Sequence, residues 1–210
     1  MKKKPVAVLL ILMIAVKETT ALVVLTKVSD DVRDISEEVR LQEMPQQINI
    51  YIETSCKGPA VKKAAGAWFV ECIKGSGELA TRGGVLYADK VTENVLTLAL
   101  VKSAFSIFTR PCQSRVFTEC SHVLNTMKNG WIWQWRENNW VTAKGTMAKN
   151  AEAWKQCAEV VEGHKTDWTN GTHPYRIKMQ SRLVKELSVK HDLPAAGIYV
   201  AVSVPEWNIG

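Results

Sequence analysis

The stretch "WRENNWVTAKGTMAKNAEAW", residues 135–154, decides the fold of this chain of 210 residues. It holds three tryptophans, and the middle ring, Trp140, stands close to Asn138 and to the basic side chains Lys144 and Lys149. Cations neutralise phosphates, and flat rings stack on bases. The stretch therefore predicts a surface for a polyanion, with the middle ring in contact with the ligand and the two outer tryptophans in the core.

The composition fits a globular domain with a basic surface. Hydrophobic residues make up 46% of the chain, which is enough for a core. The formal net charge of +6 falls on residues 48–210, because basic and acidic residues balance in residues 1–47. A basic domain attracts nucleic acid or an anionic membrane. The five cysteines form no CxxC pair, so neither a disulfide framework nor a zinc site is predicted, and a reducing, cytoplasmic location is expected.

Residues 1–47 are predicted to be an extension of the domain. They begin "MKKKPVAVLLILMIAVK", whose basic head and apolar run are typical of a secretory signal, although a bilayer span needs about 20 apolar residues. Residues 29–43 predict an acidic amphipathic helix. Three alternatives stay open for residues 1–16: export or membrane association, an apolar strand or helix of the domain, or a translation start at Met44 instead of Met1.

Alternating and helical periodicities predict an α/β domain over residues 48–190. Three strands come first and have short connections, so they are expected to be antiparallel. A helix capped by Thr92 follows, and Pro111 lies just past its end. The remaining order is strand, helices, strand and helix. The predicted strands are residues 48–54, 64–73, 79–88, 114–119 and 165–169, and the later helices are residues 121–130, 150–163 and 173–187.

The tail, residues 191–210, contains an apolar stretch of strand composition at residues 195–204. The element order of the domain does not need this stretch. One prediction pairs it with the N-terminal apolar segment, residues 5–16. Another assigns both segments to oligomerisation or membrane attachment, with the domain as a scaffold.

The element order and the Trp-rich basic insertion resemble the type 1 ribonuclease H fold, as in bacterial ribonuclease HI. The resemblance implies an α/β fold with a five-stranded mixed sheet, three antiparallel strands first, flanked by helices. In that family the matching helix, basic protrusion and following helix grip the DNA strand of an RNA/DNA hybrid. The residues that carry this match are Trp135, Trp140, Thr142, Ala143, Lys149, Asn150 and Trp154. Four further segments match in the right order: "YIETSCKG" (51–58), "TENVLTL" (92–98), "VFTECSHVLN" (116–125) and "HPYRIKMQ" (173–180).

Ribonucleases of this fold hydrolyse the RNA strand with two Mg²⁺ ions held by four carboxylates. The four positions fall here on Glu53, Thr97, Glu119 and Gln180, so two of them are neutral. The two acids are each one methylene longer than the Asp of the family. A misplacement of about 1 Å can cost on the order of 10²-fold in rate. The resemblance implies that Glu53 and Glu119 hold any retained Mg²⁺ or Mn²⁺, and that catalysis is weak or lost.

Glu93 is a candidate substitute for the missing carboxylates, because it precedes Thr97 by one helical turn on the same face. The alternative is a solvated acid in the first turn, where the helix dipole favours it. The resemblance also places His173 where the family keeps a loop histidine that helps product leave. The alternative for His173 is a plain turn before Pro174.

The resemblance implies further contacts to nucleic acid. Asn94 matches a base-reading asparagine, with a second capping residue as the alternative. Thr92 and Cys56 match phosphate contacts, with a helix cap and a buried thiol as the alternatives. The full predicted interface is Cys56, Thr92, Asn94, Asn138, Trp140, Thr142, Lys144 and Lys149.

Three classes of function remain open. The first is a hybrid-binding nuclease with slow or absent metal-dependent cleavage. The second is a non-catalytic module for hybrid or other duplex, which serves a reverse-transcribing or mobile element. The third is the scaffold described above. The basic Trp/Asn/Lys stretch favours hybrid binding over the scaffold.

Overall fold

The computed structural model describes residues 47–74, 76–188 and 198–204. By internal contacts the chain divides into Met1–Met44 and Pro45–Gly210, and the described residues all belong to the second unit. The predictions for the signal-like segment, the acidic helix and the start at Met44 lie outside the described residues. None of the described helices is long and apolar enough to cross a membrane.

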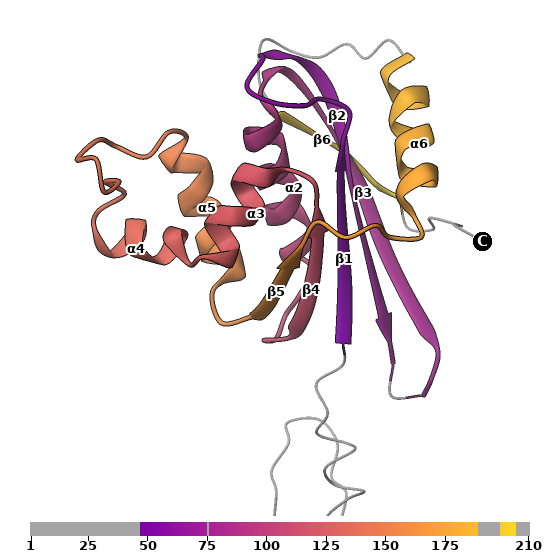
Figure 1. Cartoon of the computed structure of the whole chain (residues 1–210). Helices are drawn as coiled ribbons and strands as arrows, with labels where there is room; N and C mark the ends of the chain where they lie inside the picture. Colours follow the sequence, from indigo (N-terminus) through magenta and orange to yellow (C-terminus); the bar gives the residue numbers. More distant parts are fainter. Residues whose placement is uncertain (1–46, 75, 189–197, 205–210) are drawn as a thin grey trace, which may run out of the picture. The chain divides into compact units, whose positions relative to one another are not determined.

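A six-stranded mixed sheet forms the centre of this unit, in the order β5-β4-β1-β2-β3-β6 (Figure 1). The first three strands are antiparallel, β4 lies parallel to β1, and β5 lies parallel to β4. This arrangement confirms the predicted mixed sheet with three antiparallel strands first. The bounds of these strands are β1 Gln47–Thr54, β2 Lys62–Ile73, β3 Leu79–Val91, β4 Gln113–Thr118 and β5 Lys165–Thr169.

The tail adds a sixth strand to the five that were predicted. Strand β6, Ile198–Val204, pairs antiparallel with β3, and Tyr199 lies opposite Tyr87. The partner of the tail among the described residues is therefore β3. The N-terminal segment proposed as its partner lies outside the described residues. A stretch of strand composition pairs with whichever edge offers free backbone groups.

The helices cover the two faces of the sheet unequally. Helix α6 lies apart from the others in Figure 1, and it packs on Tyr51 and Phe69 through Met179 and Leu183. The second core cluster contains Ile50 and Ile52 of β1 with residues of the remaining helices, because successive side chains of a strand point to opposite faces. The helices are α2 Glu93–Phe105, α3 Ser121–Lys128, α4 Trp131–Glu137, α5 Ala151–Val161 and α6 Arg176–Ser188.

Gly66 sets how closely α2 approaches the sheet. A Cβ atom at this position would lie 2.5 Å from Leu100 Cδ1 and 3.2 Å from Leu96 Cγ. Only glycine leaves room for these two side chains of α2. Because Gly66 lies opposite Thr54, this close approach brings the start of α2 near the carboxyl end of β1, where the candidate site lies.

Candidate active site and nucleic-acid interface

Three carboxylates gather near the carboxyl ends of β1 and β4. Glu53 is the residue before the last of β1, and Glu119 follows the last residue of β4. The parallel register of Ile52 with Thr118 carries both acids to the same edge of the sheet. Glu93 opens α2 and joins them through a shared ion-pair partner, Lys57.

Glu53 is held by two side chains that the sequence placed in the site. It is only 2% exposed, and its Oε1 lies 3.0 Å from Nε2 of His173. Its Oε2 accepts a hydrogen bond from Nε2 of Gln180, which also donates to the carbonyl of Thr54 at 3.4 Å. The His173 ring stacks on Tyr51 at 4.6 Å between centroids. His173 is thus fixed against Glu53 and Tyr51.

Glu93 turns toward Gly58 and Lys57. It is 7% exposed, its Oε2 accepts a hydrogen bond from the backbone N–H of Gly58 at 2.6 Å, and its Oε1 lies 3.6 Å from Nζ of Lys57. The alternative of a solvated first-turn acid is therefore not what the structure shows. Thr97, one turn later, is fully buried.

Two cations that were not predicted pair with these acids. Nζ of Lys57 lies 3.0 Å from Oε2 of Glu119, and a guanidinium nitrogen of Arg176 pairs with its Oε1. Both cations sit inside matched segments, four residues after Glu53 and three after His173. Their closeness in sequence to Glu53 and His173 was the one signal that they belong to the site. An ion pair between distant segments cannot be predicted from the spacing of residues in the sequence alone.

The ion pairs shift the protonation of both partners toward the charged forms. Burial alone would raise the pKa of Glu119, but the hydrogen bond and charge of Lys57, together with Arg176, lower that pKa below its ordinary value. Burial alone would lower the pKa of Lys57, but Glu119, followed by Glu93 and Glu53, raises it. Both groups are accordingly charged at neutral pH.

The donor set does not fit a pair of divalent ions as these residues stand. Each oxygen of the three carboxylates already has a donor or cation of the chain beside it: His173 and Gln180 on Glu53, Gly58 and Lys57 on Glu93, and Lys57 and Arg176 on Glu119. Among the described residues, no three His, Cys, Asp or Glu side chains are arranged to hold a metal ion. Mg²⁺ needs free oxygen ligands in near-octahedral geometry.

Three of the predicted nucleic-acid contacts are buried or hydrogen-bonded inside the domain. Cys56 is 1% exposed, and burial raises the pKa of its thiol. Thr92 caps α2, and its hydroxyl accepts a hydrogen bond from the Val95 N–H at 3.5 Å. Asn94 accepts a hydrogen bond from the Cys120 thiol at 3.2 Å. The structural alternatives for Cys56 and Thr92 are thus observed, and their phosphate contacts stay predictions.

The loop between α4 and α5 exposes the predicted basic side chains. Lys144 and Lys149 are exposed, and so is Asn138, whose side chain donates to the Val141 carbonyl at 3.1 Å. Thr142 is half-buried and bonds across the loop to Thr146. In Figure 1 this loop lies beyond α3 on the side away from α6. We refer to Asn138, Lys144 and Lys149 as the basic loop.

Trp140 is not the open ring that was predicted. It is 9% exposed and belongs to the core. Trp154 is completely buried, and the ring of Trp135 packs against the ring of Trp154 at 5.5 Å between centroids. The backbone of Trp140 has a φ of 63°, in the left-handed region, at the end of the turn that follows α4. Trp131, which was not singled out, is instead 42% exposed on α4. The core prediction for Trp154 is confirmed.

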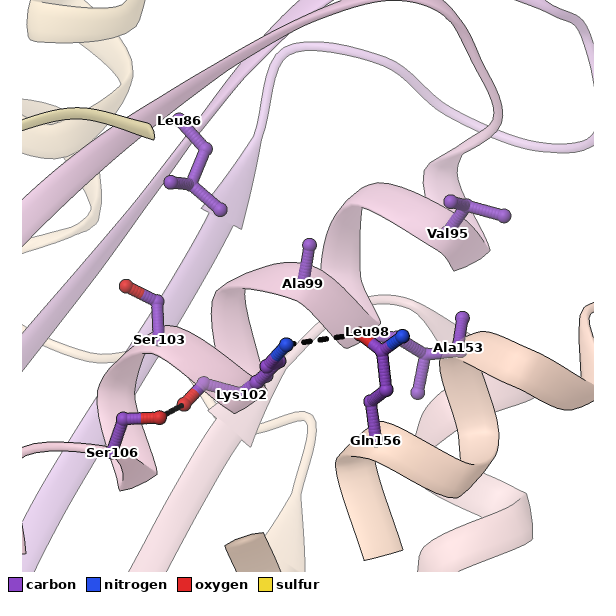
Figure 2. Close-up of a pocket in the computed structure, with 9 residues that line it drawn as sticks. All are labelled: Leu86, Val95, Leu98, Ala99, Lys102, Ser103, Ser106, Ala153 and Gln156. Carbon is purple, nitrogen blue, oxygen red and sulfur yellow. Dashed lines mark hydrogen bonds between the residues drawn. The ribbon is translucent and has the colours of Figure 1, made fainter. Parts of the chain in front are cut away.

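A separate hollow of about 400 Å³ lies between α2 and α5 (Figure 2). Its walls are mostly apolar, and a hydrogen bond of 3.0 Å from Lys102 to Gln156 crosses its side. The lining residues are Leu86, Val95, Leu98, Ala99, Lys102, Ser103, Ser106, Ala153 and Gln156. None of them is a predicted site residue, and the lining has no carboxylate, so the hollow is distinct from the carboxylate cluster of Glu53, Glu93 and Glu119.

The sheet order, the flanking helices and the acids at the ends of β1 and β4 define a ribonuclease H-like α/β domain. The RNase H family model matches residues 45–170 of this chain. The chain belongs to the RNase H family.

Similar proteins agree with this assignment. Ribonuclease HI of Neisseria meningitidis serogroup B (strain ATCC BAA-335 / MC58) is 32% identical over 126 residues, which cover 60% of this chain and 82% of that protein. Ribonuclease H of Thermoanaerobacter sp. (strain X514) is 26% identical over 121 residues, which cover 58% of this chain and 74% of that protein. The crystal structure of LC9-RNase H1, a type 1 RNase H with the type 2 active-site motif, shares the fold with a TM-score of 0.53 at 18% identity, covering 75% of this chain and 78% of that one.

Proposed function

We propose that this domain binds RNA/DNA hybrid through the basic loop and hydrolyses the RNA strand weakly or not at all. Membership of the RNase H family supports the choice of ligand. The exposed Lys144 and Lys149 supply charge for phosphates, and the exposed ring of Trp131, at the start of α4, supplies a flat surface for stacking.

The observation that carries the loss of hydrolysis is the state of the carboxylates. Two of the four family positions are the neutral Thr97 and Gln180. The acids that remain are engaged by the chain's own donors, and Glu53 is held by two of them at 2% exposure. A divalent ion would have to displace these partners before it could bind, and no compensating ligand is supplied by the neutral positions.

Binding and cleavage are tested together on a labelled RNA/DNA hybrid. We expect affinity that falls steeply as salt rises, and the same affinity in Mg²⁺, in Mn²⁺ and in a chelator at equal ionic strength. We expect cleavage no faster than that of the Glu53→Ala, Glu119→Ala double variant. Rapid cleavage that this double variant abolishes would establish the alternative, an active Mg²⁺-dependent endoribonuclease.

A reverse-transcribing or mobile element is the proposed setting for such a module. A domain that retains hybrid binding without cleavage suits a process in which hybrid is formed and must be held. A cytoplasmic location is proposed with it, since the five cysteines are all free thiols. Co-purification of RNA/DNA hybrid with the protein from its own cells, lost on treatment with an active ribonuclease H, would support this setting.

A further inference from the structure

Lys57 connects two carboxylates that come from different parts of the fold. Its Nζ lies 3.0 Å from Oε2 of Glu119, which follows β4, and 3.6 Å from Oε1 of Glu93, which opens α2. Both oxygens therefore face one point, and a single positive charge occupies that point. The side chain of Glu93 is 10% exposed and that of Glu119 is 31% exposed, so the two acids are only partly screened by water.

The backbone around Lys57 is fixed to the start of α2. The N–H of Gly58 donates to Glu93 Oε2 at 2.6 Å, and the N–H of Glu93 donates to the carbonyl of Gly58 at 3.4 Å. On the other side, Cys56 is buried in the core. Gly58 has a φ of 74°, which a residue with a side chain rarely adopts. These contacts fix the backbone from which the Lys57 side chain reaches the two acids.

We propose that the ammonium group of Lys57 occupies the position that a divalent ion would take between Glu93 and Glu119. Removal of this ammonium group then turns the two carboxylates into a divalent-cation site. Without Lys57, two partly buried like charges would face each other, which is unfavourable unless one is protonated or a cation enters. A divalent ion binds carboxylate oxygens at about 2.0 to 2.6 Å, so toward the point that Nζ now occupies the Glu119 oxygen needs to move by about 0.4 to 1 Å and the Glu93 oxygen by about 1 to 1.6 Å.

The new site is single and weak, because its neighbours do not change. Arg176 keeps its contact with the other oxygen of Glu119, and Glu53 stays bound to His173 and Gln180. Two carboxylates with water completing the shell resemble the weaker oxygen sites of proteins, with a Kd on the order of 10⁻⁴ to 10⁻³ M. This inference concerns the metal chemistry of Glu93 and Glu119 alone and does not depend on hybrid binding.

The test measures Mn²⁺ binding to the full chain without nucleic acid, from the electron paramagnetic resonance signal of free Mn²⁺. The Lys57→Met variant, which keeps the aliphatic stem, is expected to bind one Mn²⁺ at least tenfold more tightly than the wild type. Adding Glu119→Gln should remove the gain. The matched control is Lys165→Met, an exposed lysine at the start of β5, at the opposite end of the sheet, which makes the same change in net charge and should gain nothing.

Two results would overturn the proposal. One is saturable Mn²⁺ binding by the wild type that is as tight as that of Lys57→Met and depends on Glu119. The other is a folded Lys57→Met variant with no gain. Circular dichroism reports folding, and Lys57→Gln replaces Lys57→Met if the latter does not fold. Lys57→Arg keeps the charge at this point, so it should bind Mn²⁺ as weakly as the wild type.

Discussion

Nε2 of His173 lies 3.0 Å from Oε1 of Glu53, and both side chains are buried, at 4% and 2% exposure. The imidazole is also stacked on Tyr51, so this contact joins β1 to the segment before α6. The first-strand acid therefore has its partners inside the fold. It stabilises the docking of the last helix in addition to any part it takes in binding.

Replacing Gln180 by Asp tests how much the hydrogen bond from the Gln180 amide to Glu53 contributes to the stability of the domain. Gln180→Asp removes a hydrogen bond to Glu53 and adds a second carboxylate close to it. We expect a loss of unfolding free energy of about 1 to 3 kcal/mol without divalent ions, because a buried acceptor is left unsatisfied beside a like charge. Mn²⁺ should restore part of this loss. Thermal unfolding with and without Mn²⁺ measures both effects, and Gln134→Asp on the exposed side of α4 is the control that should show no metal response.

Trp140 and Trp131 should separate stability from binding. Trp140→Ala removes a core ring, and we expect it to lower the unfolding free energy by about 3 to 5 kcal/mol. Trp131→Ala should cost well under half of that but weaken hybrid binding by about 1 to 3 kcal/mol if its ring stacks on the ligand. Urea unfolding and hybrid titration check the pair. Equal stability losses, or unchanged affinity for Trp131→Ala, would contradict the exposed-ring assignment.

The fold could be predicted from local pattern because strands and helices bury their faces with different periods. Glu53 and Glu119 were placed in one site by the resemblance to the RNase H family, and the structure shows the physical reason: β1 and β4 are parallel and end at the same edge of the sheet. The burial of Trp140 could not be predicted, because its backbone is left-handed and a tryptophan rarely adopts that conformation. Lys57 was missed for another reason: its ion pairs join residues that are 36 and 62 positions apart, and the geometry of such pairs exists only after folding.

The basic loop should carry the salt dependence of binding. Lys144→Ala with Lys149→Ala should weaken hybrid binding and reduce the slope of log affinity against log salt by about 2, because two phosphate contacts are lost. The control pair is Lys74→Ala with Lys165→Ala, which lie at the opposite end of the sheet from Glu53 and should leave the slope unchanged. An unchanged slope in the first double variant would place the interface elsewhere.

Glu71 gives the domain a predictable response to acid. Burial alone would raise its pKa, but hydrogen bonds from Tyr175, Tyr51 and Asn49 lower it below the ordinary value of 4.5. The group is thus more acidic folded than unfolded, so its stabilising contribution is present above the ordinary value and is lost as the pH falls through the lowered one. Glu71→Gln removes this titration while keeping an acceptor for the tyrosines. The difference in unfolding free energy between the wild type and Glu71→Gln, measured by urea unfolding, should therefore be constant from about pH 6 to 8 and shrink in acid. A difference that stays constant down to the acid limit of folding would show that these hydrogen bonds do not favour the ionised carboxylate.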